Sequence, residues 1–145
     1  MRVQPQKPYT TRTVKIRIHY HHTDCGGVVY YANYLKFLEE GRTECLDALG
    51  VSVKALKDAG TQFVVFRQEI DYKHPAYYND VLEVKTWISG FTGVRTEFLY
   101  EIKNQDGRLV SRAKTVLVCV NQYLEPHAPP DDIAAKLQAA AAAMR

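Results

Sequence analysis

The reactive side chains of this sequence are concentrated in one short segment, His21 to Gly27, which reads His-His-Thr-Asp-Cys-Gly-Gly. Asp24 lies at its centre, and a carboxylate can act as a nucleophile or as a general base. Gly26 and Gly27 have no side chain, so a ligand can approach the backbone closely there. The segment therefore predicts a site at which Asp24 acts on a polarised carbonyl group.

A long helix is expected directly after this segment, ending at Gly50. Its first turn would leave N–H groups unpaired and carry a partial positive charge, so it could stabilise an oxyanion. An acid in front of a helix is also a common cap, so catalysis and capping are both open for Asp24. The residues that share the predicted apolar face are Tyr31, Tyr34, Leu35, Leu38, Arg42, Cys45, Leu46 and Leu49.

Alternating apolar and polar residues predict the strands that surround this helix. The expected strands are 13–20, 63–73, 81–89, 95–103 and 109–121. Short turns join the last four, so we expect them to be antiparallel neighbours in chain order. A short helix is expected at 52–59 with Ser52 as its N-cap, and an alanine-rich helix at 133–144 as a terminal appendage. The fold class is α+β, with a five-stranded antiparallel sheet wrapped around one long helix.

The composition fits a single globular domain, with 145 residues, 46% of them hydrophobic and 24% charged. We divide the chain into a tail (1–12), the domain (13–125) and a helical extension (126–145). A net charge of +3 is too small and too scattered for a nucleic-acid-binding surface, so no nucleic-acid partner is expected.

The cysteine count and the hydropathy pattern exclude other classes. The three cysteines are far apart and form no C-x-x-C pair, which argues against a disulfide framework or a zinc cage. No run of 18 apolar residues suggests a membrane span. These features predict a cytoplasmic protein.

Two motifs resemble the 4-hydroxybenzoyl-CoA thioesterase family of the hotdog superfamily. The first runs from His22 to Tyr34, continues in Phe37-Leu38-Glu39 and Arg42, and is similar to the family signature T-D-x-x-G-[IV]-V-[YF]-x-x-x-Y. The second is Asp71-Tyr72-Lys73-His74-Pro75-Ala76, with Asp80, Leu82 and Val84 after it. The resemblance covers residues 13–121.

The resemblance implies a hotdog homodimer or homotetramer with active sites at the subunit interface, acting on an acyl-CoA substrate by hydrolysis of the thioester. Asp24 corresponds to the family's catalytic aspartate. Tyr31 corresponds to the residue whose backbone N–H polarises the thioester carbonyl. Neither a cofactor nor a metal is implied. The residues expected to contact substrate are Gly27, Val29, Tyr34 and Arg95.

The residue type at Tyr31 favours one branch of that family. The bacterial acyl-CoA thioesterases associated with the Tol-Pal system have histidine at this position, whereas the hydroxybenzoyl-CoA branch has tyrosine. The resemblance therefore favours substrates with aromatic acyl groups. It also argues against a mechanism that needs a second, imidazole acid or base.

Other functions are open beside the leading one. A non-catalytic acyl-thioester-binding module, or a thioesterase acting on acyl carrier protein, would use the same fold. A hotdog dehydratase would need a histidine in the pocket, and neither His74 nor His127 is placed there by the sequence. A Cys25–His22 thiol nucleophile lacks an orienting third group. The spacing of His21, His22 and Asp24 matches no recognised metal site.

Overall fold

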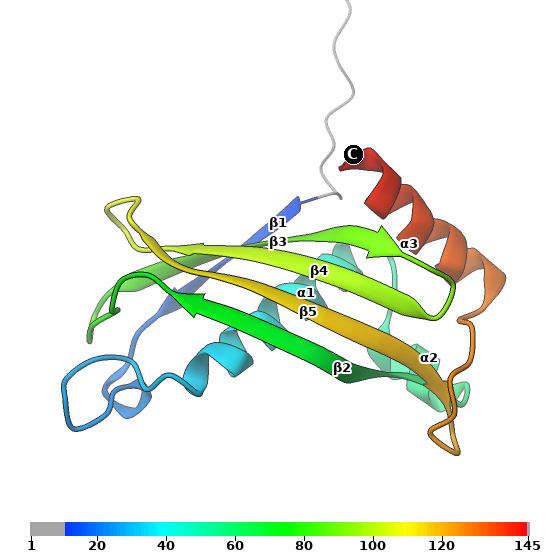
Figure 1. The fold of residues 1–145 in the computed structure, drawn as a ribbon, viewed down its shortest axis with the longest axis horizontal. Helices are drawn as coiled ribbons and strands as arrows, with labels where there is room; N and C mark the ends of the chain where they lie inside the picture. The colour runs from blue at the N-terminus through cyan, green and yellow to red at the C-terminus, as the bar shows by residue number, and fades with distance from the viewer. Residues whose placement is uncertain (1–10, 145) are drawn as a thin grey trace, which may run out of the picture.

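The computed structural model describes residues 11–144, so the predicted tail lies almost entirely outside the described residues. The chain forms one five-stranded antiparallel sheet with helices against it (Figure 1). In chain order the elements are β1 (Thr11–Arg17), a 3-10 turn η1 (Tyr20–His22), α1 (Asn33–Ala48), α2 (Val53–Asp58), β2 (Thr61–Tyr72), β3 (Val81–Phe91), β4 (Arg95–Lys103), β5 (Leu109–Asn121) and α3 (Asp131–Ala143). The predicted α+β class is confirmed.

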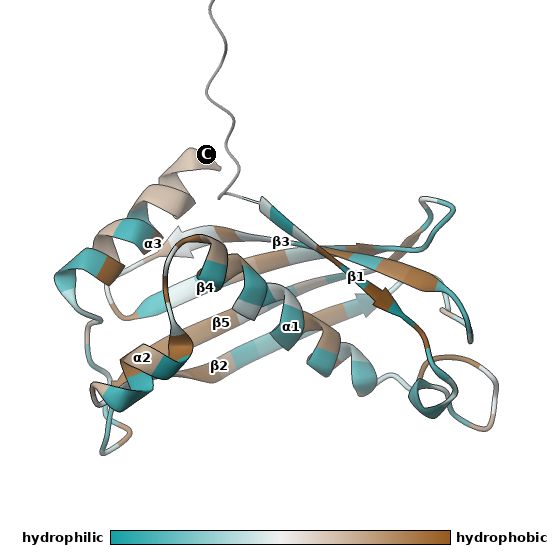
Figure 2. Cartoon of the chain, turned by 180° about the vertical axis from the view of Figure 1, so that it is seen from behind, coloured by the Kyte–Doolittle hydropathy of each residue, from teal (hydrophilic) through white to brown (hydrophobic). Residues whose placement is uncertain are grey.

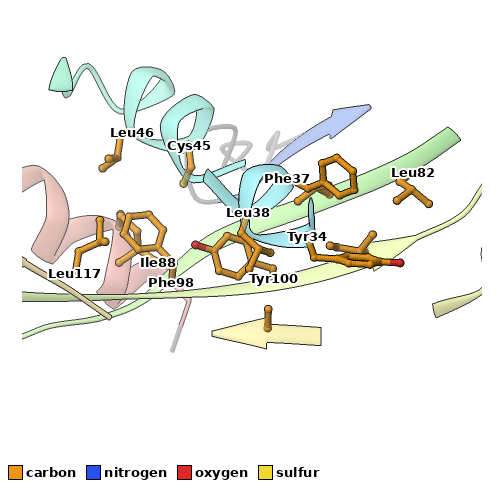
Figure 3. Close-up of a cluster of buried hydrophobic side chains, with 14 of the residues drawn as sticks. Tyr34, Phe37, Leu38, Cys45, Leu46, Leu82, Ile88, Phe98, Tyr100 and Leu117 are labelled. Carbon is orange, nitrogen blue, oxygen red and sulfur yellow. The ribbon is translucent and has the colours of Figure 1, made fainter. Parts of the chain in front are cut away.

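The sheet curls around α1 and buries one face against it. Alternate residues of β3 and β4 are buried, as period-two patterning requires. Figure 2 shows α1 lying across this sheet with hydrophilic residues on its outward side. Figure 3 shows how the side chains of the two layers meet in the core. The core side chains labelled there are Tyr34, Phe37, Leu38, Cys45 and Leu46 from α1, and Leu82, Ile88, Phe98, Tyr100 and Leu117 from the sheet.

The order of the strands differs from the predicted chain order. The sheet runs β1-β3-β4-β5-β2, so β2 pairs with β5 and forms an edge. The prediction that β2 and β3 are neighbours is therefore wrong. The eight-residue connection 73–80 can span about 26 Å when extended, which exceeds the roughly 14 Å across three strand spacings. Its length therefore permits a crossover as well as a hairpin.

The helix α1 begins two residues later than its apolar pattern predicts. Tyr31 lies before it and is 62% exposed, and Leu35 in its first turn is 47% exposed. Both are predicted on the buried face, and the structure leaves both exposed. Further along, Gly41 approaches β3 so closely that an added Cβ would lie 2.5 Å from Thr86 Oγ1. A side chain there would separate helix and sheet.

The C-terminal helix α3 is a packed part of the fold. Its buried residues are Ile133, Leu137, Ala140 and Ala141, and it lies against β3. The expectation of a mere appendage is therefore wrong, because the alanine-rich sequence has an apolar stripe at helical spacing. The predicted cap of α2 is confirmed, since Ser52 Oγ accepts a hydrogen bond from Ala55 N at 3.1 Å. Among the described residues, no helix has the length and apolar character to cross a membrane.

Candidate active site

The segment that leads into the candidate site leaves the sheet earlier than predicted. β1 ends at Arg17 rather than at Tyr20, and a 3-10 turn follows. Thr23 Oγ1 donates a hydrogen bond to the Tyr20 carbonyl at 2.7 Å and fixes the end of this turn. Tyr20 is consequently 78% exposed instead of continuing the apolar face of the strand.

Asp24 lies in a tight, hydrogen-bonded turn. Its backbone N–H donates to the Val28 carbonyl at 2.9 Å, and Gly27 N donates back to the Asp24 carbonyl at 3.1 Å. Gly27 adopts φ +81°, a conformation that favours glycine. One carboxylate oxygen, Oδ1, accepts from Gly26 N at 2.7 Å. The turn therefore fixes the carboxylate while its side chain remains exposed.

Asp24 does not cap the long helix. The N-cap residue of α1 is Ala32, which provides no side-chain hydrogen bond. The carboxylate instead caps its own loop through Gly26. The capping interpretation of Asp24 is therefore wrong for α1.

The chain just before α1 offers an unpaired backbone donor. Asn33 N donates to the Tyr30 carbonyl at 2.9 Å, and Tyr34 N donates to the Tyr31 carbonyl at 3.3 Å. Among the described residues, the Tyr31 N–H has no acceptor. An N–H group at a helix start that is free in this way can donate a hydrogen bond to a developing oxyanion.

A hydroxyl group holds the same peptide segment from the opposite side. Tyr72, the last residue of β2, donates its hydroxyl hydrogen to the Tyr31 carbonyl at 3.1 Å. The rings of Tyr31 and Tyr72 also meet edge to face, with their centroids 6.5 Å apart. β2 thereby orients the residue that carries the free N–H.

A pocket of about 290 Å³ opens beside this segment. Tyr34 and Val29 form its buried parts, with exposed fractions of 3% and 5%. Asp24 is not on its wall, but Val28, whose carbonyl accepts the Asp24 N–H, is. The lining residues are Val28, Val29, Tyr31, Tyr34, Tyr72, Lys73, His74 and Pro75.

Tyr34 and Tyr72 are neutral hydrogen-bonding groups of the pocket at physiological pH. Burial, together with the nearby Tyr72 and Asp80, raises the pKa of Tyr34 to about 12. Burial also raises the pKa of Tyr72, with a smaller contribution from Tyr31. Because both phenols keep their protons, neither acts as a base in the pocket.

Most of the predicted site residues lie in one region of the structure, the pocket and the turn beside it. Val29, Tyr31 and Tyr34 line one pocket, and Gly27 lies in the adjoining turn. Arg95 lies elsewhere, at the start of β4, with its guanidinium 4.6 Å from the centre of the Phe66 ring. Figure 1 shows that this end of the sheet is opposite the one that carries the Asp24 loop.

The predicted site residues leave out five residues of the pocket wall, namely Val28, Tyr72, Lys73, His74 and Pro75. The available signal for the last four was the second motif, which contains them. The predicted site residues also leave out Asn33, whose Nδ2 donates to the His22 carbonyl at 2.8 Å and ties the loop to α1.

The alternative thiol nucleophile finds no support in the described residues. Cys25 is exposed, whereas the ring of His22 packs edge to face on Phe37, with centroids 5.5 Å apart. His22 Nδ1 accepts the backbone N–H of His19 at 2.8 Å. The neutral ring therefore already uses its one lone pair.

Known proteins are similar to this chain in both sequence and fold. A family model described as the thioesterase-like superfamily matches residues 17–137. The acyl-CoA thioester hydrolase YbgC of Escherichia coli O6:H1 is 36% identical over 124 residues, which are 85% of this chain and 92% of that protein. A 1,4-dihydroxy-2-naphthoyl-CoA hydrolase of Thermosynechococcus vestitus is 29% identical and covers 92% of both chains.

The structural comparison agrees. The DHNA-CoA thioesterase from Staphylococcus aureus superimposes with a TM-score of 0.85 at 27% identity, over 93% of this chain and 95% of that one. The chain therefore has the hotdog fold and belongs to the thioesterase-like superfamily.

Proposed function

We propose that this protein hydrolyses acyl-CoA thioesters, with Asp24 and the Tyr31 N–H at the reacting carbonyl. The observation that carries the proposal is their joint placement. Tyr31, whose N–H is unpaired among the described residues, lines the aromatic pocket. The exposed Asp24 lies in the adjoining turn, where its own N–H donates to the carbonyl of the pocket residue Val28. The family membership and the activity named for its Escherichia coli relative support the same reaction.

Each group has a defined task in this reaction. The thioester carbonyl oxygen accepts the Tyr31 N–H, which stabilises the negative charge that develops there. Asp24 either attacks the carbonyl carbon or removes a proton from the attacking water. When Asp24 attacks, the coenzyme A thiolate leaves and an acyl–Asp24 anhydride remains, and water hydrolyses this anhydride to the free acid and restores the carboxylate. When Asp24 is the base, water adds to the carbonyl carbon, the thiolate leaves and takes up the proton that Asp24 received, and the acyl group is released as a free acid.

The pocket favours a compact, ring-containing acyl group. Its volume of about 290 Å³ lies at the small end of ligand pockets. Tyr34 and Tyr72 line it and pack edge to face on each other, with ring centroids 5.3 Å apart, and an aromatic acyl group can join such a ring pair. The 1,4-dihydroxy-2-naphthoyl-CoA named for the relative from Thermosynechococcus vestitus supports this class.

We infer that a second copy of the chain completes the enzyme. β2 is an edge strand of 12 residues, and its Phe66 is 59% exposed. Such an edge readily pairs with an identical edge in antiparallel register, which also makes a symmetric dimer. The pairing would bring the end of the sheet that carries Arg95 nearer to the partner's pocket. Sedimentation should then give the mass of two chains or four.

The test of the proposed reaction is thiol release from a panel of CoA thioesters, aliphatic and aromatic, by wild type and Asp24→Asn. The amide keeps an oxygen for the Gly26 N–H but loses the negative charge. We expect a loss of at least about a hundredfold, or about 2.7 kcal/mol in barrier. Asp106→Asn is the matched control, because Asp106 is an equally exposed carboxylate in the β4–β5 turn. It should retain full activity.

The possible results separate the functions that the fold allows. Equal activity of wild type and Asp24→Asn would show that Asp24 takes no part in the mechanism, while the assignment as a hydrolase would stand. Binding of thioesters without thiol release by wild type would instead identify a binding module. Faster hydrolysis of acyl thioesters of acyl carrier protein than of coenzyme A would identify acyl carrier protein as the carrier of the substrate.

A further inference from the structure

Three histidines gather beside the candidate active site without taking part in the proposed reaction. From the sequence we considered His21, His22 and Asp24 as metal ligands and expected no site. The structure groups His19, rather than Asp24, with the two other histidines. One ring nitrogen from each of the three lies within 4.8 Å of those of the others.

The backbone explains why these side chains converge. The strand β1 ends at Arg17, and η1 turns the chain so that His19, His21 and His22 project to the same side. Ring centroids of His21 and His22 are 4.1 Å apart, and those of His19 and His22 are 5.7 Å apart. Had β1 continued to His22, residues 19 and 21 would share a face and residue 22 would lie on the opposite one.

The group lines a hollow of about 530 Å³ between β1 and α1. Lys15, Arg17 and Lys36 border it with positive charge, and Glu40 and Glu44 with negative charge. This mixed border with three imidazoles does not suit Mg²⁺ or Ca²⁺, which take oxygen ligands. Imidazole nitrogen suits Zn²⁺, Ni²⁺ and Cu²⁺ instead.

We propose that His19, His21 and His22 form a binding site for a divalent transition-metal ion of the zinc type. His19 is the best-prepared ligand, since its Nδ1 donates to the Arg17 carbonyl at 3.1 Å. That bond fixes the tautomer and leaves Nε2 with its lone pair, as in many metal-binding histidines. His21 is exposed and can turn either nitrogen inward.

His22 is the third ligand, and it must give up a hydrogen bond to bind the metal. Its Nδ1 accepts the His19 N–H, so it binds metal through that atom only when the metal replaces this hydrogen bond.

The distance to be closed is small. Ligand nitrogens around tetrahedral zinc are about 3.4 Å apart, given Zn–N bonds of about 2.05 Å. Nitrogens 4.8 Å apart at most must therefore approach by about 1.4 Å. Rotation of the exposed His21 ring, together with the release of the hydrogen bond at His22, supplies this movement, and water completes the four ligands.

A bound ion would brace the loop that carries Asp24. The His22 carbonyl accepts both Tyr30 N at 2.9 Å and Asn33 Nδ2 at 2.8 Å. Fixing the side chain of His22 therefore also fixes the segment that joins η1 to the start of α1. This bracing is independent of the proposed thioesterase reaction.

The test is titration of the tag-free, full-length protein with Zn²⁺ by calorimetry. We expect one ion per chain. His19→Ala and His21→Ala should each weaken binding at least tenfold, the lower limit for losing even an outer-shell partner. His127→Ala and Cys25→Ser are the matched controls and should leave the affinity unchanged. Circular dichroism establishes that each variant is folded.

Hydrogen exchange gives a second measurement that needs no activity. Zn²⁺ should slow exchange of the Tyr30 amide in wild type but not in His21→Ala. Three results would overturn the proposal: absence of stoichiometric binding, an unchanged affinity in both His19→Ala and His21→Ala, or loss of binding in Cys25→Ser alone. The last would move the site to the thiol.

Discussion

Replacing Gly41 with alanine tests how closely α1 approaches the sheet. An added Cβ would lie 2.5 Å from Thr86 Oγ1 and 3.0 Å from Val84 Cγ1. Both neighbours are fully buried, with exposed fractions of 0%, so neither can move into solvent. The new methyl group must therefore displace the helix or strain β3.

Two opposing effects set the magnitude. Alanine stabilises a helix interior by about 1 kcal/mol relative to glycine. Overpacking a buried site costs about 1–3 kcal/mol, and a contact at 2.5 Å with a β-branched residue belongs at the upper end. The net expectation for Gly41→Ala is a loss of about 2 kcal/mol in the free energy of unfolding. For a chain of this size that lowers Tm by roughly 4–8 °C.

A double-mutant cycle in urea identifies the cause. Thr86→Ala removes the hydroxyl that meets the new methyl group, and this hydroxyl has no hydrogen-bond partner among the described residues. Gly41→Ala should therefore cost about 1 kcal/mol less in the Thr86→Ala background than in wild type. Stabilisation by Gly41→Ala, or the same cost in both backgrounds, would refute the close-packing argument.

Two further predictions concern tyrosines of the pocket. Tyr72→Phe removes the hydrogen bond from the Tyr72 hydroxyl to the Tyr31 carbonyl, which is worth about 0.5–1.5 kcal/mol. We therefore expect kcat for the best thioester to fall about 2- to 12-fold, with little change in KM. An altered KM at constant kcat would contradict a positioning role for Tyr72. The fold raises the pKa of Tyr34 from 10.0 to about 12, so its contribution to stability is complete below pH 10 and is lost as the pH rises toward 12. The urea midpoint should decline over that range, and less steeply in Tyr34→Phe; equal slopes would refute the assignment. Cys45, whose pKa burial raises to about 11, contributes to the decline in both proteins.

The sequence alone determined the elements of this fold. Period-two alternation located β2 to β5 within two residues at each end, because each strand buries one face. The change to helical spacing identified α1, and Ser52 identified the start of α2. The segment around Asp24 could also be recognised from the sequence as a candidate site, because its residue types and its two glycines rarely occur together for structural reasons alone.

Tertiary structure alone decided which elements are neighbours. The connection 73–80 carries no local signal that distinguishes a hairpin from a crossover, so the pairing of β2 with β5 depends on how the sheet closes around α1. That crossover places Tyr72 and His74 beside Tyr31, which are more than 40 residues apart in the chain. No periodicity encodes such a contact.

The histidine group illustrates the same division at short range. The residues His19, His21 and His22 are plain in the sequence, but an uninterrupted strand would divide them between two faces. Only the early end of β1 and the 3-10 turn bring their ring nitrogens together. Sequence supplies the side chains, whereas the path of the backbone decides which of them meet.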